Sequence, residues 1–268
     1  MVQDTATEPK THAEWVSLWS GLSEPSERHA WRPRLPVTPA EVMGCRFVLH
    51  PADNFTELCM WESGLPREHA ATEFIAEALD GLDPVIVDVG ANAGAFFLPI
   101  HLRGGRGTRS IAFEPNPDMR ARLVRNIALN GFDGSVHVFD CAVSDRVGRS
   151  ALYFPRNGNQ GQGRIDVAYP HRQASMGVAV DVRPLLECLL EVGVPHVDFL
   201  KVDVEGLEDR VIVPLLESNA ALRPKMIYFE TVHDGVWSLA LMETLEKHGY
   251  DLIEQFDKNA LFLRDGKR

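Results

Sequence analysis

Five short apolar segments that alternate with helical patterns constrain most strongly what this chain can fold into. The segments are residues 85–90, 110–115, 135–140, 197–206 and 225–231. Each is typical of a buried β-strand, and the stretches between several of them have helical periodicity. Strands that alternate with helices and are apolar on both faces predict an α/β fold, a mostly parallel sheet with helices on both sides.

The ends of the chain extend this pattern. Residues 250–256 and 259–265 are joined by a short polar turn and predict an antiparallel C-terminal hairpin. Residues 66–268 are therefore expected to form one α/β domain, and its first helix is expected to begin at Pro66. Residues 1–65 are expected to be an N-terminal extension, with a short amphipathic helix from Thr11 and then a proline-rich, extended connector. This extension would cover a site or make a homodimer contact, and simple packing against the core is the alternative.

The overall composition excludes several classes of protein. The formal net charge is −11 and no basic run occurs, so nucleic acid is not an expected partner. No apolar run reaches the roughly 18 residues of a membrane span, and the first ten residues lack the apolar core of a signal peptide. The four cysteines are widely separated and form no C-x-x-C pair, which indicates reduced, mostly buried thiols and a cytoplasmic protein.

One segment interrupts the alternation. Residues 156–176 are rich in Gly, Asn and Gln, and they show no periodicity. An aperiodic loop of this length in a compact domain is often a lid or a binding loop. A surface loop without function is the alternative.

The loop after the first strand, with the sequence GANAG, indicates a cofactor. Gly90 and Gly94 permit a tight turn and the close approach of a ligand. The spacing from Gly90 through Asn92 to Gly94 lacks the third glycine of a dinucleotide-binding motif. Asp88 would also be unfavourable beside a diphosphate. A carboxylate suits a cationic ligand, and S-adenosylmethionine carries an ammonium and a sulfonium group.

The next two strand ends supply further cofactor candidates. Glu114 can accept hydrogen bonds from both hydroxyls of a ribose, and Asn116 follows it at the start of a helix. Asp140 is placed to bind an adenine amino group, with Cys141 and Ala142 as the wall of the pocket. A turn cap is the alternative role for Asp140.

The last two strands place charged groups at the same edge of the sheet. Lys201, Asp203 and Glu205 alternate along the fourth segment, so we expect their side chains to face one cleft. Charged groups on a buried strand are costly unless they are paired or functional, and an ion-pair network is the structural alternative. Glu230 ends the fifth segment and His233 follows it.

In this order the segments resemble the FkbM family of S-adenosylmethionine-dependent methyltransferases. The matching segments are VIVDVGANAGAFF, IAFEPNP, CAVSD, LKVDVEGLEDRVI and IYFETVH, and the similarity covers residues 66–265. The resemblance implies a Rossmann-like, class I methyltransferase fold with seven strands. It also implies O-methylation of a hydroxyl on a small molecule such as a sugar or secondary metabolite.

The resemblance carries over to individual residues. Asp88, Gly90, Asn92 and Gly94 would form the first cofactor loop, and Glu114 would hold the ribose. Asp203 would lie near the methionine end of the cofactor. Pro99 and the N-terminal extension depart from the family pattern and leave the substrate open.

A hydroxyl that attacks the sulfonium methyl must lose its proton. His233 is the first candidate for the base, and Lys201 is the second if burial lowers its pKa. Asp203 and Glu230 could instead chelate Mg²⁺, although two carboxylates are too few for us to assign a metal. Three other functions are methyl transfer to nitrogen or a carboxylate, a nicotinamide-dependent oxidoreductase, and a non-catalytic cofactor-binding protein.

Overall fold

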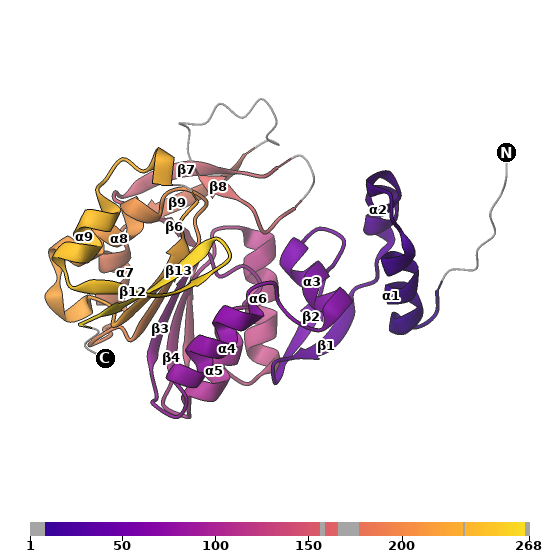
Figure 1. Ribbon diagram of the computed structural model, residues 1–268, viewed down its shortest axis with the longest axis horizontal. Helices are drawn as coiled ribbons and strands as arrows, with labels where there is room; N and C mark the ends of the chain where they lie inside the picture. Colours follow the sequence, from indigo (N-terminus) through magenta and orange to yellow (C-terminus); the bar gives the residue numbers. More distant parts are fainter. Residues whose placement is uncertain (1–8, 156–158, 166–176, 233, 266–268) are drawn as a thin grey trace.

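The computed structural model describes residues 9–155, 159–165, 177–232 and 234–265. Its centre is a seven-stranded sheet (Figure 1). In sheet order the strands are β12 (Tyr250–Phe256), β13 (Asn259–Arg264), β11 (Met226–Glu230), β10 (Phe199–Val202), β3 (Val85–Val89), β4 (Arg109–Phe113) and β5 (Val136–Phe139). Strands β11, β10, β3, β4 and β5 are parallel, whereas β12 and β13 form an antiparallel hairpin at one edge. The expected class I methyltransferase architecture is confirmed.

Two apolar layers cover the two faces of this sheet. One contains α4 (His69–Ala78), α5 (Phe97–Gly104) and α6 (Pro117–Leu129), packed on side chains such as Ile86 and Phe199. The other contains α7 (Leu185–Glu191), α8 (Glu208–Ser218) and α9 (Leu241–Lys247), packed on Val87 and Leu200. Successive strand residues face opposite layers, which explains why these strands are apolar throughout.

The region between β5 and α7 forms a second, smaller sheet. Its strands are, in order, β6 (Cys141–Val143), β9 (Val178–Arg183), β7 (Gly148–Tyr153) and β8 (Arg164–Ile165). Strand β8 lies within the segment that we expected to be structureless, so that expectation is wrong for residues 164–165. A two-residue strand leaves no periodic pattern in a sequence, and only its pairing with Leu152 and Tyr153 defines it. Residues 156–158 and 166–176 lie outside the described part of the chain.

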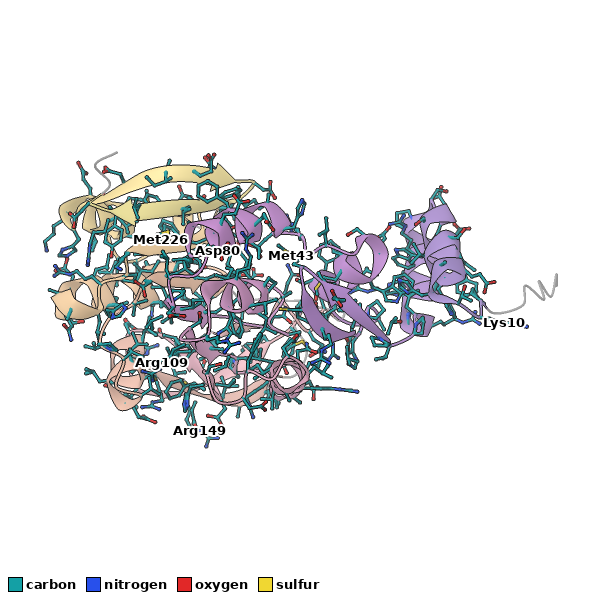
Figure 2. All side chains as sticks on the ribbon, turned by 90° about the horizontal axis from the view of Figure 1, so that it is seen from below. Lys10, Met43, Asp80, Arg109, Arg149 and Met226 are labelled. Atoms are coloured by element: carbon teal, nitrogen blue, oxygen red, sulfur yellow. The ribbon has the colours of Figure 1, made fainter. Side chains whose placement is uncertain are left out.

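The N-terminal extension contains more structure than its sequence indicates. Its elements are α1 (His12–Gly21), α2 (Pro25–Trp31), the 3₁₀ helix η1 (Arg32–Arg34), β1 (Thr38–Val42), β2 (Cys45–Leu49) and α3 (Phe55–Ser63). The capping box of Thr11 and Glu14 is present, and Trp15 and Trp19 are buried. Figure 2 shows Lys10, near the start of this segment, at the far end of the molecule from Met226.

Part of the proline-rich connector is a strand. Residues Thr38–Val42 pair with Cys45–Leu49 in a hairpin, whose turn residues Met43 and Gly44 both have positive φ. Such a two-residue turn matches the twist of paired strands. Pro39 is tolerated because β1 and β2 form a two-stranded sheet, in which each strand has a free edge.

Helix α4 differs from its expectation in two respects. The helix begins at His69 rather than at Pro66, and Phe74, expected on its apolar face, is 40% exposed. Phe74 meets Phe256 of the C-terminal hairpin edge to face, with 5.7 Å between ring centroids.

Among residues 9–155, 159–165, 177–232 and 234–265, no helix combines the length and apolar character needed to cross a membrane.

Gly90 is required where β3 leaves the sheet. Its φ is +86°, and a Cβ at this position would collide with the main-chain carbonyl oxygen of Asp203. The loop after β3 and the end of β10 can therefore touch only because residue 90 has no side chain. The close approach that we expected from a cofactor is made here by a neighbouring strand.

We predict that Gly90→Ala destabilises the fold by about 2–5 kcal/mol, because strain of the left-handed backbone adds to a collision with a main chain. Gly131→Ala is the matched control, since Gly131 has a φ of +72° and open space around its Cα. That control should cost only about 1–2 kcal/mol. Urea unfolding of both variants measures the difference, and equal losses would show that the contact with Asp203 is unimportant.

Candidate active site

A cavity of about 330 Å³ lies beyond the carboxyl ends of the central strands. Its walls come from the ends of β3, β4, β10 and β11, from β6, and from residues 159–165. The N-terminal extension contributes Phe55 and Thr56, and the start of the α/β domain contributes residues 66–68. Ligands of open α/β sheets bind at this edge, and the volume falls within the roughly 300–1,000 Å³ typical of small-molecule sites.

Glu114 lies buried at the end of β4 and connects two cavity walls. One carboxylate oxygen accepts a hydrogen bond from the main-chain N–H of Asn92, and the other accepts one from the N–H of Asn116, both at 2.8 Å. Burial raises the pKa of Glu114 to about 7, although these two hydrogen bonds oppose the rise. Each oxygen keeps a second lone pair for a ligand.

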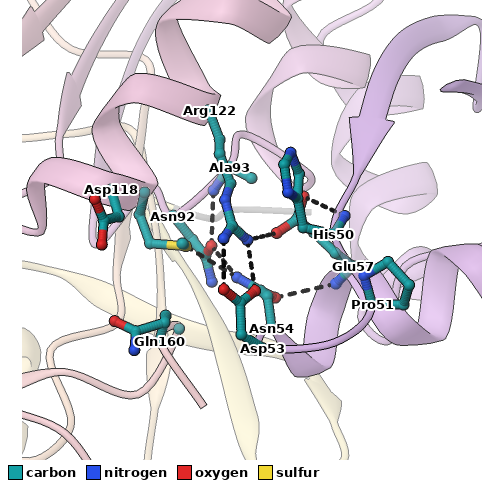
Figure 3. Close-up of polar contacts among 12 residues, drawn as sticks. His50, Pro51, Asp53, Asn54, Glu57, Asn92, Ala93, Asp118, Arg122 and Gln160 are labelled. Carbon is teal, nitrogen blue, oxygen red and sulfur yellow. Dashed lines mark hydrogen bonds and ion pairs between the residues drawn. The ribbon is translucent and has the colours of Figure 1, made fainter. Parts of the chain in front are cut away.

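Helix α3 of the N-terminal extension begins beside the loop after β3, and hydrogen bonds hold the two together (Figure 3). The side-chain N–H of buried Asn54 donates to the side-chain oxygen of Asn92 at 2.7 Å. Arg122 of α6 donates to both carboxylate oxygens of Asp53, at 2.9 and 2.7 Å, and to Glu57 at 2.7 Å. Burial raises the pKa of Glu57 to about 7, and the charge of Arg122 limits that rise.

Residues 159–165 form hydrogen bonds with the start of α3 and the residues just before it. The main-chain N–H of Gln160 donates to the carbonyl of Asp53 at 2.8 Å, and the N–H of Phe55 donates to the side chain of Asn159 at 3.1 Å. The side-chain amide of Asn116 donates to the carbonyl of Gln160 at 3.2 Å. The start of α3 and the described part of the inserted loop therefore line the cavity together.

A buried row of polar side chains crosses the floor of the site. Asp88, Lys201 and Tyr228 are direct neighbours on β3, β10 and β11, on the face covered by α4, α5 and α6. The ammonium of Lys201 lies 3.1 Å from Asp203 and 3.7 Å from Asp88. It also lies 5.4 Å from the ring centre of Phe96, within cation–π range. The ion-pair network that we considered as the alternative is present.

The charge state of Lys201 corrects one expectation. Burial by itself would lower the pKa of Lys201, but the carboxylates of Asp203, Asp88 and Glu68 together raise it above the usual lysine value. The side chain is therefore an ammonium ion at neutral pH. An ammonium has no lone pair to accept a proton, so Lys201 is not a general base.

Asp88 also differs from its expected role. It is completely buried, and it is not among the residues that line the cavity. Asp88 lies on the same face of β3 as Ile86, two residues earlier, and this face is covered by α4, α5 and α6. Burial raises its pKa to about 6, with Lys201 opposing the rise. Asp88 therefore faces Lys201 rather than a bound cation.

Three more candidates lie elsewhere than expected. Glu205 follows the end of β10 at Val202 in a turn, with a φ of +58°, so strand alternation does not place it. It lines the cavity nonetheless and pairs with Arg164 at 2.7 Å. Asp140 is exposed outside the lining, whereas Cys141 and Ala142 belong to it. Gly94 also lies outside the lining, where it makes room for Leu98 and Leu123.

The remaining candidates are placed as follows. Gly90, Asn92, Asn116, Asp203 and Glu230 line the cavity. His233 lies outside the described residues, so its role as a base stays a prediction. Within the described ranges, no group of three His, Cys, Asp or Glu side chains is arranged to hold a metal ion.

Sequence analysis missed Glu68 and Asn259, which also line the cavity. The side-chain N–H of Asn259 and the hydroxyl of Tyr228 both donate to one oxygen of Glu68, at 3.3 and 3.1 Å. Because the helix was expected to begin at Pro66, Glu68 looked like an ordinary acidic residue of a first turn. The pairing of β11 with β13 brings Tyr228 and Asn259 to the same region, and only the folded structure shows that both reach Glu68.

Comparison with known proteins agrees with this geometry. The family described as "Methyltransferase FkbM domain" matches residues 88–252. The chain belongs to the FkbM methyltransferase family. Its fold is accordingly that of a methyltransferase.

Three relatives show the extent of the similarity. The 2-O-methyltransferase NoeI of Sinorhizobium fredii is 28% identical over 204 residues, which cover 69% of this chain and 79% of NoeI. The 31-O-demethyl-FK506 methyltransferase FkbM of Streptomyces tacrolimicus is 28% identical over 199 residues, covering 65% of this chain and 75% of the relative. A crystal structure of methyltransferase FkbM from Methylobacillus flagellatus aligns at 17% identity with a TM-score of 0.46, over 68% of this chain and 43% of that one.

We predict that Arg122→Met lowers the free energy of unfolding of this FkbM methyltransferase by about 1–3 kcal/mol, since it leaves the buried Glu57 without its charged donor. Arg103→Met is the control, because Arg103 makes ion pairs with Glu73 and Asp80 at the surface. Exposed pairs of this kind contribute at most about 1 kcal/mol. Urea denaturation of both variants provides the test, and a loss at Arg122 no larger than the loss at Arg103 would contradict it.

Proposed function

We propose that this protein transfers the methyl group of S-adenosylmethionine to a hydroxyl oxygen of a small molecule. The observation that carries the proposal is Glu114, a buried carboxylate at the end of β4 that lines the cavity beside the loop after β3. Two relatives support the choice of oxygen as acceptor, because their names are those of a 2-O-methyltransferase and of a methyltransferase acting on 31-O-demethyl-FK506.

The residues of the cavity fit this cofactor. The free lone pairs of Glu114 suit two ribose hydroxyls, and Phe113, Cys141 and Ala142 offer a largely apolar wall for an adenine ring. Asp203, half-buried at the end of β10, supplies a carboxylate toward the cationic methionine end. A nicotinamide dinucleotide fits less well, because the loop after β3 lacks the third glycine that a dinucleotide-binding turn uses.

The cofactor, once bound, supplies an activated methyl group. The chain's own residues then have to orient an acceptor, exclude water and remove the hydroxyl proton. A nitrogen or carboxylate acceptor is the second possibility for the same fold, and a labelled methyl donor with acceptors of each class distinguishes them.

We predict that Glu114→Ala weakens binding of S-adenosylhomocysteine about 10- to 100-fold, the equivalent of about 1.5–3 kcal/mol for hydrogen bonds to a charged group. Glu243→Ala, an exposed position on α9, should leave the affinity unchanged. Isothermal titration of the wild type and both variants with S-adenosylmethionine, S-adenosylhomocysteine and NAD measures the affinity for each ligand. Tight binding of NAD without binding of either adenosyl ligand would refute the proposal.

The same titration should depend on pH. Because the pKa of Glu114 is raised to about 7 in the free protein, a fraction of this group is protonated at neutral pH. Ribose hydroxyls favour the ionised form, so affinity should rise as pH increases from about 6 to about 8, with release of a proton on binding. Glu114→Ala should abolish this part of the pH dependence.

We further propose that the start of α3 and residues 159–165 act as a lid over the bound cofactor. Their hydrogen bonds to the loop after β3 and to Asn116 support this role. Saturation with S-adenosylhomocysteine should slow amide hydrogen exchange in residues 53–57 and 159–165, with no change in α9 as the control. Unchanged exchange in both segments of a saturated complex would leave them as a fixed wall.

A further inference from the structure

We propose that Glu68 is the general base that accepts the proton of the acceptor hydroxyl. The inference rests on the O-methyl transfer proposed above, and it assigns a group that sequence analysis did not identify. Four observations lead to it: the position of Glu68 in the cavity, the way its carboxylate is held, the charges around it, and the state of the other candidates.

Glu68 lies on the side of the cavity away from Glu114. Its partners Tyr228 and Asn259 belong to β11 and β13, which follow β10 in the sheet order, whereas Glu114 ends β4 on the opposite side of β3. A cofactor held across the ends of β3 and β4, with its methionine end toward Asp203, leaves the end of β11 and the start of β13 for the acceptor. Glu68 therefore faces the part of the cavity where the acceptor hydroxyl would lie.

Both described hydrogen bonds to the Glu68 carboxylate go to the same oxygen, Oε1. Glu68 is the N-cap residue of α4, yet its side chain makes no capping hydrogen bond. Instead Oε1 accepts from the hydroxyl of Tyr228 at 3.1 Å and from the amide of Asn259 at 3.3 Å. Within the described part of the chain, Oε2 has no hydrogen-bond partner. An oriented carboxylate with one unused oxygen at a cavity wall is what proton abstraction from a hydroxyl requires.

The surrounding charges favour a basic carboxylate. Burial raises the pKa of Glu68, and the carboxylates of Asp203 and Asp88 raise it further, whereas Lys201 and the hydrogen bond from Tyr228 lower it. The net result is a raised pKa. A carboxylate with a raised pKa is a stronger base once it is ionised.

The neighbours of Glu68 in the chain do not compete for its carboxylate. The adjacent Arg67 pairs with Asp257 at 3.0 Å, and the ring Nδ1 of His69 lies 3.2 Å from the carbonyl of Pro66. The groups that face Glu68 from other elements are Lys201 and Asp203 from β10 and its end, Asp88 from β3, Tyr228 from β11 and Asn259 from β13.

Three other groups of the described cavity are less suited to this role. Lys201 is protonated, and both oxygens of Glu114 already accept main-chain hydrogen bonds on the cofactor side. Glu205 is paired with the cation of Arg164. In the proposed step the O–H proton passes to Oε2 of Glu68 while the oxygen–methyl bond forms and the methyl–sulfur bond breaks. The protonated Glu68 then returns its proton to solvent.

The main test compares Glu68→Gln with Glu77→Gln, an exposed glutamate on the same helix. A labelled methyl donor and a panel of simple sugars and alcohols serve as substrates. Glu68→Gln should keep the affinity for S-adenosylhomocysteine within about two-fold and lose about 10²–10⁴ in turnover, the usual contribution of general-base catalysis. Glu77→Gln should match the wild type.

The pH profile separates a base from a structural residue. Wild-type turnover should rise with pH as Glu68 ionises and then reach a plateau. Tyr228→Phe removes a donor that favours the ionised carboxylate, so it should shift this rise to higher pH. Glu68→Gln should lose this pH-dependent rise.

A readout without catalysis comes from urea unfolding of the ligand-free protein. Because folding raises the pKa of Glu68, the stability of the wild type relative to Glu68→Gln should fall as pH rises through the folded-state pKa. A stability difference that is independent of pH would show that Glu68 does not titrate as required.

Several results would overturn the proposal. One is near-normal turnover and an unchanged pH profile in Glu68→Gln, and another is a loss of turnover in His233→Ala that Glu68→Gln does not share. Abolition of turnover by EDTA with recovery on adding Mg²⁺ would assign proton removal to a metal. A wild type that methylates no hydroxyl would refute the proposed function together with the base, and the inactive wild type distinguishes that case from the others.

Discussion

The ammonium of Lys201 is the group around which the polar side of this sheet is arranged. It is 3% exposed, in the middle of β10, and a lone charge at such a depth would cost far more than a domain can offset. Asp88 on the neighbouring strand and Asp203 just beyond β10 compensate it at 3.7 and 3.1 Å. Gly90 allows the main chain at Asp203 to approach the loop after β3, so the charge cluster and the cofactor loop depend on the same contact.

This cluster also separates the cavity into two chemically different halves. On the side of β4, Glu114 organises the main chain of Asn92 and Asn116 into a rigid acceptor site. On the side of β11 and β13, two donors hold one oxygen of Glu68, a half-buried residue that lines the cavity. The hydrogen bonds of the two glutamates differ, and this difference supports the proposed division of roles, cofactor binding for Glu114 and proton transfer for Glu68.

The cover of the site joins segments that are far apart in the sequence. Asp53 and Asn54 precede α3, Asn92 follows β3, Arg122 belongs to α6, and Gln160 comes from the inserted region. Most of these contacts use amide and carboxylate side chains or main-chain groups, which can exchange partners with little change in energy when a ligand enters. Contacts of this kind are compatible with the lid proposed for these segments.

The sequence by itself determined the order and type of the central elements. Two apolar runs, residues 85–90 and 110–115, are separated by a segment with helical periodicity. Both faces of such strands must be buried, and few folds satisfy this requirement. The same local patterns placed Glu114, Asn92, Asp203 and Glu230 at the cavity, since residues just beyond parallel strands share one edge of the sheet. The C-terminal hairpin followed from two segments, residues 250–256 and 259–265, joined by a short polar turn.

Only the tertiary structure decided which of these groups face a ligand and which face each other. Asp88 and Lys201 look alike as site residues in the sequence, yet cross-strand register pairs them, with Lys201 in the cavity lining and Asp88 outside it. Asp140 lies one residue from the wall of the pocket but points to solvent, while the two-residue strand β8 brings Arg164 to Glu205. Glu68 gains its importance from Tyr228 and Asn259, which are 160 and 191 residues away in the chain. Sequence patterns report which way a side chain leaves its own strand or helix, whereas contacts between distant elements depend on register and packing, and these exist only in the folded protein.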